Sequence, residues 1–443
     1  MGSWIRVHAI SACTLSARED PSLGHEITFN KQEGTLGRVS RQSSRYVGAM
    51  STYLVLGLGM QGTAAAHDLF LHGGATRLVL VDSDRKRLGE AAARLTSLMA
   101  GSPVELQTHV LDVAMARFEG EDEVSAALGS LFAGAELCMN CLPYRFSLAM
   151  TRFALEHATH IADLGGNTAI VREQLAMAAS HENGAQVAVL PDCGLMPGMG
   201  NLFAAHALGE LGDCESIHIR CCGLPTDPKP PLDYMLLFNV NGLINEYFGM
   251  AQVLRQGEIR EVQTFGELES IGLPMPSHLA GAGRDFEAFI TSGGLSTLPW
   301  SFEGRVQDLD YKTVRYAGHH AKFKLLKDLG LFAETGEGPP RKILGSCLEA
   351  ALDHPDDEDL AFLRCTARAG GKQLQLEMFD LRDGETGFTA MERTTAYSAT
   401  ACLYGVLIGK TKVGAGPIEN AVDTGWYLEA LGQRGIGVSV TRS

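Results

Sequence analysis

The chain has 443 residues, of which 45% are hydrophobic and 20% charged, so it is long enough for more than one domain with a buried core. Its formal net charge of −15 argues against nucleic acid or an anionic membrane as a binding partner. No apolar run approaches the roughly 18 residues that a membrane span requires. The composition therefore predicts a soluble, cytoplasmic, globular protein.

The ten cysteines are scattered along the chain, and one pair, Cys138 and Cys141, has C-x-x-C spacing. No second Cys or His pair follows at the distance of a zinc site, so the sequence predicts no metal site. Reduced, mostly buried thiols are expected, which agrees with a cytoplasmic location.

Residues 1–49 differ from the rest of the chain. They are rich in Ser, Arg and Gly and have no sustained hydrophobic periodicity. No apolar segment follows a basic start, so a secretory signal is not predicted. We expect 1–49 to be a disordered extension and the folded part to begin at Met50.

A dinucleotide-binding turn opens the folded part. The apolar run Tyr53–Leu56 is typical of a strand buried on both faces, and it leads into a G-x-G-x-x-G turn. An Ala-rich helix is predicted over 61–71, followed by a strand over Arg77–Asp82. In this strand–turn–helix context the motif predicts binding of a nicotinamide dinucleotide through Gly57, Gly59, Met60, Gln61 and Gly62.

Each glycine of this turn has a separate physical role. Gly57 permits the tight turn, Gly59 lets the backbone approach the pyrophosphate, and Gly62 lets the helix pack closely on the strand. The start of the helix then offers unpaired N–H groups to the phosphates. The alternative is a glycine turn with a structural role alone.

Asp82 ends the second predicted strand and bears on the choice of cofactor. A carboxylate there accepts hydrogen bonds from both ribose hydroxyls and repels a 2′-phosphate, which favours NAD. Arg85 and Arg87 lie close by and would favour the phosphate of NADP. We predict NAD, with NADP as the alternative.

Strands and helices continue to alternate, which predicts an α/β Rossmann domain over residues 50–194 with a doubly wound parallel sheet. The further strands are expected at Val104–Asp112, Glu136–Leu142, His160–Leu164 and Gln186–Pro191, and the helices at Glu121–Phe132, Phe146–His157 and Ala169–Ser180. Ligands bind at the carboxyl ends of such strands. Residues predicted to shape the nicotinamide pocket there are Asn140, Cys141, Leu142 and Pro143.

The second half has a different character, and we expect residues 195–390 to form an α+β domain for substrate binding and dimerisation. A helix is predicted over Leu232–Phe248, and strands at Glu215–Gly223, Ala288–Thr291, Gly304–Leu309, Lys312–Tyr316, Leu360–Ala369 and Lys372–Asp380. The last two, joined by Gly370-Gly371, predict a hairpin. Residues 391–443, with helices at Thr394–Ile408 and Ala421–Gly432, are expected to complete the first domain.

Several segments together resemble the saccharopine dehydrogenase-like family, and within it the L-lysine 6-dehydrogenases. Besides the glycine turn, they are Asp163–Gly166, Pro191–Met199, Pro230–Tyr234, Thr291–Thr297, Tyr311–His319 and Ala390–Tyr397. The resemblance implies NAD-dependent oxidation of the lysine ε-amino group to 2-aminoadipate 6-semialdehyde, which cyclises to piperideine-6-carboxylate, with release of ammonia. It also implies a homodimer or higher homo-oligomer. Pro143 stands where an aromatic or apolar residue is expected in the lysine enzymes.

Two other functions stay open at this point. One is a saccharopine or carboxynorspermidine dehydrogenase, which acts on a secondary amine. The other is a protein that binds NAD without catalysis, because a fold alone does not establish an activity.

Amine oxidation requires a neutral nitrogen, whose lone pair builds the C=N bond, and therefore a base and a group that steadies the iminium charge. Asp163 at the end of the fifth strand is predicted to be the carboxylate; the alternative is a cap for the next helix. His319 is predicted to be the base, or else a structural hydrogen bonder. Tyr144 is predicted to orient the amine, or else to be a packed aromatic.

The α-carboxylate of an amino acid calls for a bidentate cation, and Arg315 is the candidate; a surface salt bridge is the alternative. The donor-rich turn Thr291–Gly294 can hold a carboxylate with backbone N–H groups. Lys312 either pairs with the substrate or extends along its strand. The predicted substrate-binding residues are Gly165, Gly166, Thr291, Ser292, Gly293 and Arg315.

Overall fold

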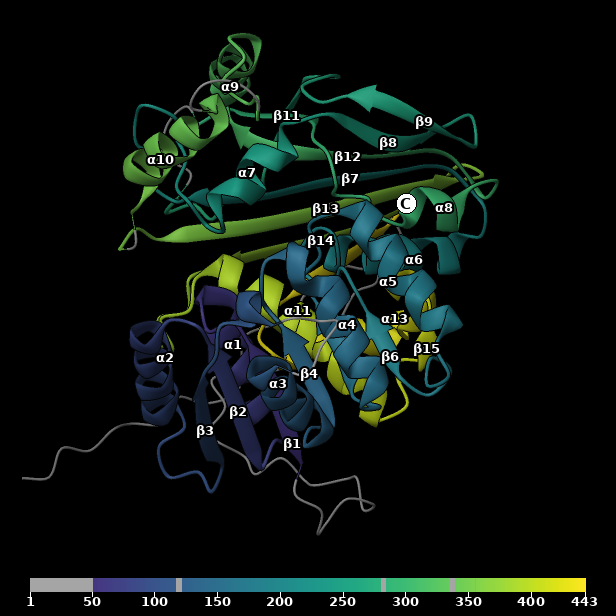
Figure 1. The fold of residues 1–443 in the computed structure, drawn as a ribbon. Helices are drawn as coiled ribbons and strands as arrows, with labels where there is room; N and C mark the ends of the chain where they lie inside the picture. Colours follow the sequence, from purple (N-terminus) through teal and green to yellow (C-terminus); the bar gives the residue numbers. More distant parts are fainter. Residues whose placement is uncertain (1–50, 117–121, 280–283, 335–338, 355) are drawn as a thin grey trace, which may run out of the picture.

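The computed structural model describes residues 51–116, 122–279, 284–334, 339–354 and 356–443. The predicted extension over 1–49 lies outside these residues. Two β-sheets with helices around them build the described part, and they are stacked one above the other in Figure 1. No helix of the described residues has both the length and the apolar composition needed to span a membrane.

The first sheet has seven parallel strands in the order β15-β6-β5-β4-β1-β2-β3. The strands are β1 (Thr52–Leu56), β2 (Arg77–Asp82), β3 (Glu105–Val110), β4 (Leu137–Asn140), β5 (His160–Asp163), β6 (Ala188–Leu190) and β15 (Gly414–Ala415). This arrangement confirms the predicted Rossmann-like α/β fold. The strand β15, near the C-terminus, adds an edge strand that the sequence did not predict.

Period-2 alternation of side chains explains how helices cover both faces of this sheet. Tyr53 and Val55 of β1 pack with α1 (Met60–Leu71) and α2 (Arg85–Leu98) in one apolar cluster. Leu54 and Leu56 point to the other face and pack with α3 (Glu123–Ala133), α4 (Ser147–Glu156) and α5 (Thr168–Ser180). A strand buried on both sides therefore reads as a continuous apolar run.

The second sheet is mixed and has nine strands, with the path β10-β11-β12-β7-β13-β14-β16 and the hairpin β8–β9 attached to β12. Its strands are β7 (Cys214–Pro225), β8 (Met250–Arg255), β9 (Glu258–Gln263), β10 (Glu269–Ile271), β11 (Phe286–Ile290), β12 (Val306–Tyr316), β13 (Asp359–Ala369), β14 (Lys372–Leu381) and β16 (Val438–Arg442). The hairpin β13–β14 was predicted, and Gly370 and Gly371 turn it with φ of +57° and +78°.

Three predicted elements of the second half, one helix and two strands, differ from the structure. The helix expected over Leu232–Phe248 is confined to α7 (Val240–Glu246), and Asp233, with φ of +54°, has a backbone that no α-helix accepts. The two strands expected at 304–309 and 312–316 are the single strand β12, because Asp310 and Tyr311 continue its pairing with β7. The strands β8, β9, β10 and β16 were not predicted.

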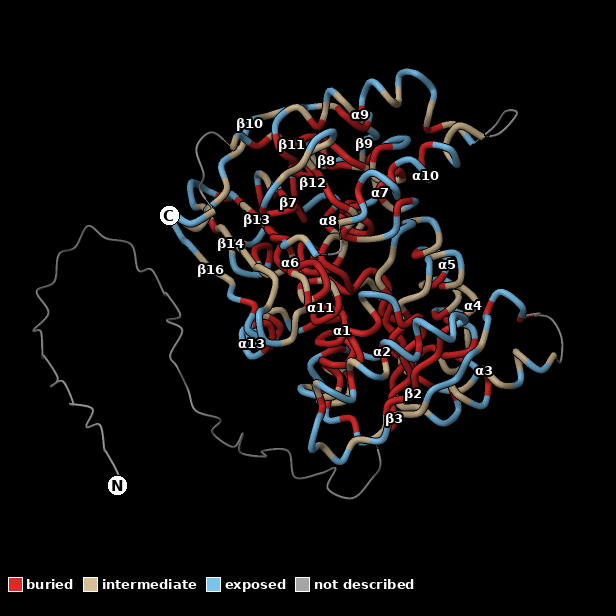
Figure 2. Tube along the Cα trace, turned by 90° about the vertical axis from the view of Figure 1, so that its left-hand side faces the viewer, coloured by how far each residue is buried: buried red, intermediate tan, exposed pale blue. Residues whose placement is uncertain are grey.

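One long helix joins the two sheets, and another packs on the second sheet. The helix α11 (Ala390–Leu407) begins with a capping box between Thr389 and Glu392, and it packs against α1, β4 and β5 below and β13 above. The helix α6 (Met199–Leu211) packs against β13 and β14. Figure 2 shows the buried trace continuing from the first sheet through α1 and α11 to the second, so both sheets share one apolar core.

Candidate functional site

The glycine turn after β1 has the geometry of a pyrophosphate cradle. Gly57 has φ of +84°, and its N–H donates to the Val81 carbonyl at 2.8 Å. A Cβ on Gly59 would meet no atom within 4 Å, so this backbone faces open space that a ligand can approach. A Cβ on Gly62 would lie 1.8 Å from the Gly57 carbonyl oxygen, so helix and turn touch there.

Charge favours an anion at the same place. The helix α1 starts at Met60 with Gly59 as its N-cap, and no side chain caps its first N–H groups. Such unpaired N–H groups and the positive end of the helix dipole bind phosphate. The residues present therefore fit a nicotinamide dinucleotide.

Asp82 lies beside this cradle and is buried. Its Oδ2 accepts the Leu58 N–H at 2.7 Å and its Oδ1 accepts the Asp84 N–H at 2.8 Å. The half-exposed guanidinium of Arg87 lies 3.6 Å from Oδ1. The Asp82 carboxylate thus fixes the turn, and its remaining lone pairs can accept hydrogen bonds from a ribose. The guanidinium of Arg87 could instead pair with a 2′-phosphate.

The end of β4 closes the cradle from behind. A Cβ on Gly57 would lie 3.0 Å from the Cys141 carbonyl oxygen and 3.2 Å from the Leu142 side chain. Asn140 is fully buried; its Oδ1 accepts the Leu142 N–H at 3.2 Å, and its Nδ2 has no partner among the described residues. A buried amide donor without a partner is costly, so it points to a ligand atom at this edge. Pro143 then leads into the short helix η2 (Tyr144–Phe146).

Burial raises the pKa of the Cys141 thiol to about 12, and burial raises that of Cys138 well above its ordinary value. Both thiols are therefore protonated at neutral pH. Within the part of the chain that is described, no group of His, Cys, Asp and Glu is arranged to hold a metal ion.

A cavity of about 430 Å³ lies between the loop after β5 and the second sheet. The predicted site residues that line it are Tyr144, Gly166, Thr291, Ser292 and Gly293. Further polar residues of its wall are Asn167, Asn245, Gln252, Glu261, Ser296, Tyr311, Glu334 and Arg341. The fold thus places Tyr144 and Gly166 of the first domain and the predicted substrate turn Thr291–Gly294 of the second domain around the same cavity.

The turn Thr291–Gly294 follows β11 and forms a fixed floor. The Ser292 N–H donates to the Glu246 carbonyl at 2.8 Å, and the Ser292 hydroxyl donates to the Asn245 carbonyl at 2.7 Å. The Thr291 hydroxyl is hydrogen-bonded to that of Thr313 at 2.8 Å. The floor is therefore anchored on α7 and β12, so its geometry does not depend on a ligand.

Arg315 does not line the cavity, so it is not placed to bind the substrate α-carboxylate as the sequence predicted. Its guanidinium is 3% exposed and donates to the Tyr247 hydroxyl at 2.9 Å, the Val314 carbonyl at 3.0 Å and the Glu246 carboxylate at 3.0 Å. These contacts occupy Nε, Nη1 and Nη2. Arg315 therefore supports α7, on which the Thr291 turn rests.

Arg341 is the cation that sequence reasoning missed. It lies at the start of α10 (Pro340–Leu352), lines the cavity, and pairs with Glu334 at 3.2 Å and with the Asn245 side chain. No motif surrounds it in the sequence, and only the long-range packing of α10 on α7 brings it to this wall.

His319 also lies outside the cavity wall. Its Nε2 contacts the Tyr247 hydroxyl at 2.9 Å and its Nδ1 contacts the Leu232 carbonyl at 3.1 Å. Burial, with the nearby charge of Arg315, lowers its pKa well below the usual value. Both ring nitrogens are occupied, so its contacts are those of the structural alternative.

Asp163 is buried and is not among the residues that line the cavity. Its Oδ1 accepts the Gly165 N–H at 2.8 Å and the Asp192 N–H at 3.3 Å, and its Oδ2 accepts Nε2 of Gln174 at 2.7 Å. Burial raises its pKa. The alternative reading as a cap of α5 is wrong, because Asn167 caps that helix.

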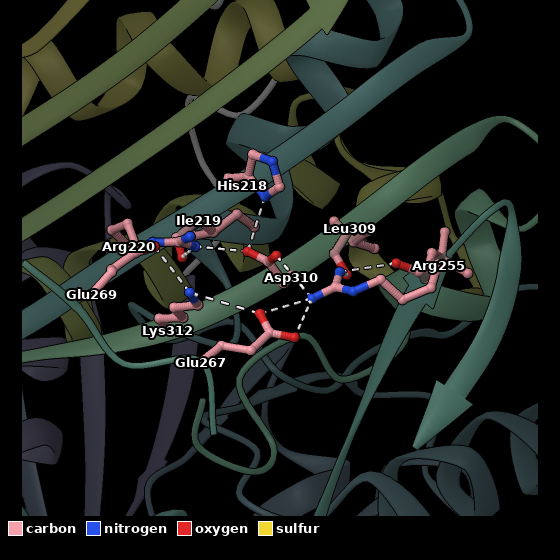
Figure 3. A network of polar contacts seen from close by, with 10 residues as sticks. His218, Ile219, Arg220, Arg255, Glu267, Glu269, Leu309, Asp310 and Lys312 are labelled. Carbon is pink, nitrogen blue, oxygen red and sulfur yellow. Dashed lines mark hydrogen bonds and ion pairs between the residues drawn. The ribbon is translucent and has the colours of Figure 1, made fainter. Parts of the chain in front are cut away.

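Lys312 belongs to a separate ion-pair network on the second sheet, which is drawn in Figure 3. Its Nζ lies 2.9 Å from Glu269 and 3.7 Å from Glu267. Asp310 in the same network pairs with Arg220 at 2.7 Å and with His218 at 3.0 Å. These charges neutralise one another, and none of their residues lines the cavity.

Comparison with known proteins agrees with this geometry. The family model of the saccharopine dehydrogenase NADP binding domain matches residues 53–189, and that of the saccharopine dehydrogenase C-terminal domain matches residues 194–436.

One of the similar solved structures has the same fold, and two others match more weakly. Apo saccharopine dehydrogenase (L-Glu forming) from Saccharomyces cerevisiae has a TM-score of 0.63 at 16% identity, over 89% of this chain and 100% of that one. A probable dehydrogenase from Thermotoga maritima has a TM-score of 0.39 at 13% identity, over 88% and 98%. An oxidoreductase domain protein from Kribbella flavida has a TM-score of 0.39 at 12% identity, over 84% and 92%. Because the two family models match residues 53–189 and 194–436, the chain belongs to the saccharopine dehydrogenase family of oxidoreductases.

Proposed function

We propose that the protein oxidises the ε-amino group of L-lysine with NAD, releasing ammonia and forming 2-aminoadipate 6-semialdehyde, which cyclises. The observation that carries this proposal is the polar cavity, in which Tyr144 and Gly166 from the cofactor side face the Thr291 turn and Arg341. An amino-acid side chain bound there would lie between Tyr144 and Gly166 on one side and the Thr291 turn and Arg341 on the other.

The head of an amino acid carries one carboxylate and one ammonium. Arg341 and Glu334, paired at 3.2 Å on the cavity wall, offer a cation and an anion side by side. Such a pair is complementary to a zwitterion, and a guanidinium binds a carboxylate with two parallel hydrogen bonds. We therefore assign Arg341 to the α-carboxylate in place of Arg315.

When bound, a nicotinamide dinucleotide would supply the acceptor for the hydride that leaves the carbon bearing the amine. Gly57, Gly59 and Gly62 would hold the pyrophosphate and Asp82 the adenine ribose. The Nδ2–H of Asn140, which has no partner among the described residues, would donate a hydrogen bond to the nicotinamide end of the cofactor. The chain must also remove a proton from the ammonium, whose pKa in water is about 10.4.

We propose NAD as the cofactor because a 2′-phosphate would meet the buried Asp82 carboxylate. Arg87 supports the alternative, and the family model is that of an NADP binding domain. Initial rates with NAD and NADP in parallel decide between them.

Oxidation of saccharopine is the second candidate, favoured by the family and by the yeast enzyme of the same fold. Saccharopine has three carboxylates, whereas lysine has one. Among the described residues of the cavity wall, Arg341 is the one Lys or Arg side chain. One cation matches one carboxylate, so the wall favours lysine.

Turnover tests the proposal. Purified protein with NAD should form NADH from L-lysine alone and release an equal amount of ammonia. NADH formation from saccharopine and none from lysine would move the assignment to the second candidate. Binding of NAD without turnover of any amine would indicate a protein without catalysis.

A further inference from the structure

Asp192 and Ser296 meet where the first sheet borders the cavity. Asp192 follows β6, and Ser296 follows the Thr291 turn of the second domain. The Ser296 hydroxyl donates to the Asp192 carboxyl. Ser296 lines the cavity, whereas Asp192 is 2% exposed and lies behind it. One hydroxyl therefore connects the cavity to a buried carboxyl group.

The backbone is shaped to make this contact. Asp192 has φ of +61° and Ser296 has φ of +44°, a left-handed region that residues other than glycine rarely adopt. Such conformations persist where the surrounding structure holds them, and they gather at functional sites. A Cβ on Gly165 would lie 1.7 Å from Oδ1 of Asp192, so the loop after β5 closes on this carboxyl. The Gly166 N–H donates to it as well.

The surroundings suit a group that gains and loses a proton near neutral pH. Burial raises the pKa of Asp192 to about 8; the hydrogen bond from Ser296 opposes this rise, and the negative charges of Asp163 and Glu419 add to it. Asp163 faces Asp192 from β5, and Glu419 faces it from α12 (Ile418–Ala421). A base works best when its pKa lies near the working pH.

We propose that Ser296 and Asp192 form the relay that removes the proton from the substrate amine, a role that rests on the proposed amine oxidation. The ammonium N–H proton passes to Ser296 Oγ while the Ser296 O–H proton passes to Asp192 Oδ2. The serine is regenerated, the carboxylate becomes a carboxylic acid, and the nitrogen keeps the lone pair that builds the C=N bond. The acid then returns its proton to solvent before the next turnover.

Two variants test the relay by kinetics. Asp192→Asn keeps the size and the acceptor of the side chain, and Ser296→Ala removes a single hydroxyl. Each should lower kcat by about 100-fold or more with KM for the amine little changed, and each should abolish the acid limb of the kcat profile. Ser296→Ala keeps the test in place if Asp192→Asn fails to fold.

A matched control removes the same kind of hydrogen bond elsewhere. The Ser125 hydroxyl donates to the Asp122 carboxylate at 2.7 Å at the start of α3, and Ser125 does not line the cavity. Ser125→Ala should keep the wild-type kcat and pH profile. If Asp192→Asn kept kcat within about threefold of wild type, the relay would be refuted.

A second readout needs no turnover. Infrared difference spectra between about pH 6 and about pH 10 should show a carboxylic C=O band that is lost on alkalisation in the wild type and missing in Asp192→Asn. A wild-type spectrum without that band overturns the relay. If the wild type oxidises saccharopine and not lysine, the proposed substrate fails while the relay is judged by the same variants, because a secondary ammonium must also lose a proton.

Discussion

The Nη2 atom of Arg315 lies 3.0 Å from the Glu246 carboxylate, and the Glu246 carbonyl in turn accepts the N–H of Ser292 on the cavity floor. The buried Arg315 is therefore linked to the cavity floor through Glu246. Arg315→Met leaves the Glu246 carboxylate without its partner, which should lower the free energy of unfolding by about 3 kcal/mol. Denaturant unfolding measures this; unchanged stability with a raised KM for lysine would instead place Arg315 at the substrate.

Arg341 should act on the substrate itself. Arg341→Ala should lower kcat/KM for L-lysine by about 100-fold, because a charged hydrogen bond to the α-carboxylate is lost. The diamine 1,5-diaminopentane has no carboxylate, so its slower oxidation should be the same in wild type and variant. An equal loss on both substrates would show that Arg341 has no specific contact with the carboxylate.

The glycine turn offers a matched pair of variants. Gly59→Ala places its methyl group in open space, so the protein should fold with wild-type stability while NADH binding weakens by about tenfold or more. Gly62→Ala forces a methyl group against the Gly57 carbonyl and should lower the melting temperature. Thermal unfolding and NADH fluorescence separate the two effects; equal behaviour of both variants would contradict the cradle.

Cofactor choice should depend on Asp82 and Arg87. Arg87→Ala removes the cation 3.6 Å from Asp82 and should raise the preference for NAD over NADP by about tenfold. Asp82→Ala should weaken that preference. Ratios of kcat/KM for the two cofactors measure both changes, and a preference for NADP in the wild type would reverse the assignment of Asp82.

The contact between the start of β13 and the start of α11 should depend on pH. Asp359 of β13 accepts the N–H groups of Ala390 and Met391 at 2.7 and 2.9 Å. Burial raises its pKa from 3.8 to about 6. A raised carboxyl pKa stabilises the fold below the unfolded pKa, and that contribution is lost as pH rises through the folded value. Relative to Asp359→Asn, the wild type should lose about 3 kcal/mol of unfolding free energy between about pH 4 and about pH 7. A flat difference would contradict the shift.

Local sequence predicted the first domain well because its signals are local. The strand β1 is buried on both faces, and Gly62 is required by its close contact with Gly57, five residues earlier. The placement of Arg315 could not be predicted in this way. It shares a face of β12 with Tyr311, which lines the cavity, but lies four residues further, about 13 Å along the strand, where α7 covers it.

The same reason explains Arg341 and Ser296. Both reach the cavity through packing between segments far apart in the sequence. No motif surrounds Arg341, and Ser296 stands in Thr291–Thr297, where the sequence assigned no role to this serine. Asp192 lies in Pro191–Met199, one of the segments that carry the family resemblance, yet its neighbours Asp163 and Glu419 and its left-handed backbone are properties of the folded chain. Patterning predicts strands, while the assignment of a site requires the tertiary contacts.

Oxidation of lysine at its ε-carbon is tested most directly with a deuterium-labelled substrate. Purified protein is mixed with NAD and L-lysine that carries deuterium at both C6 positions, and the reduced cofactor is examined by mass spectrometry. Each reduced cofactor molecule should carry one deuterium, and the semialdehyde should keep the other. Reduced cofactor without deuterium, or none formed, would contradict oxidation at this carbon.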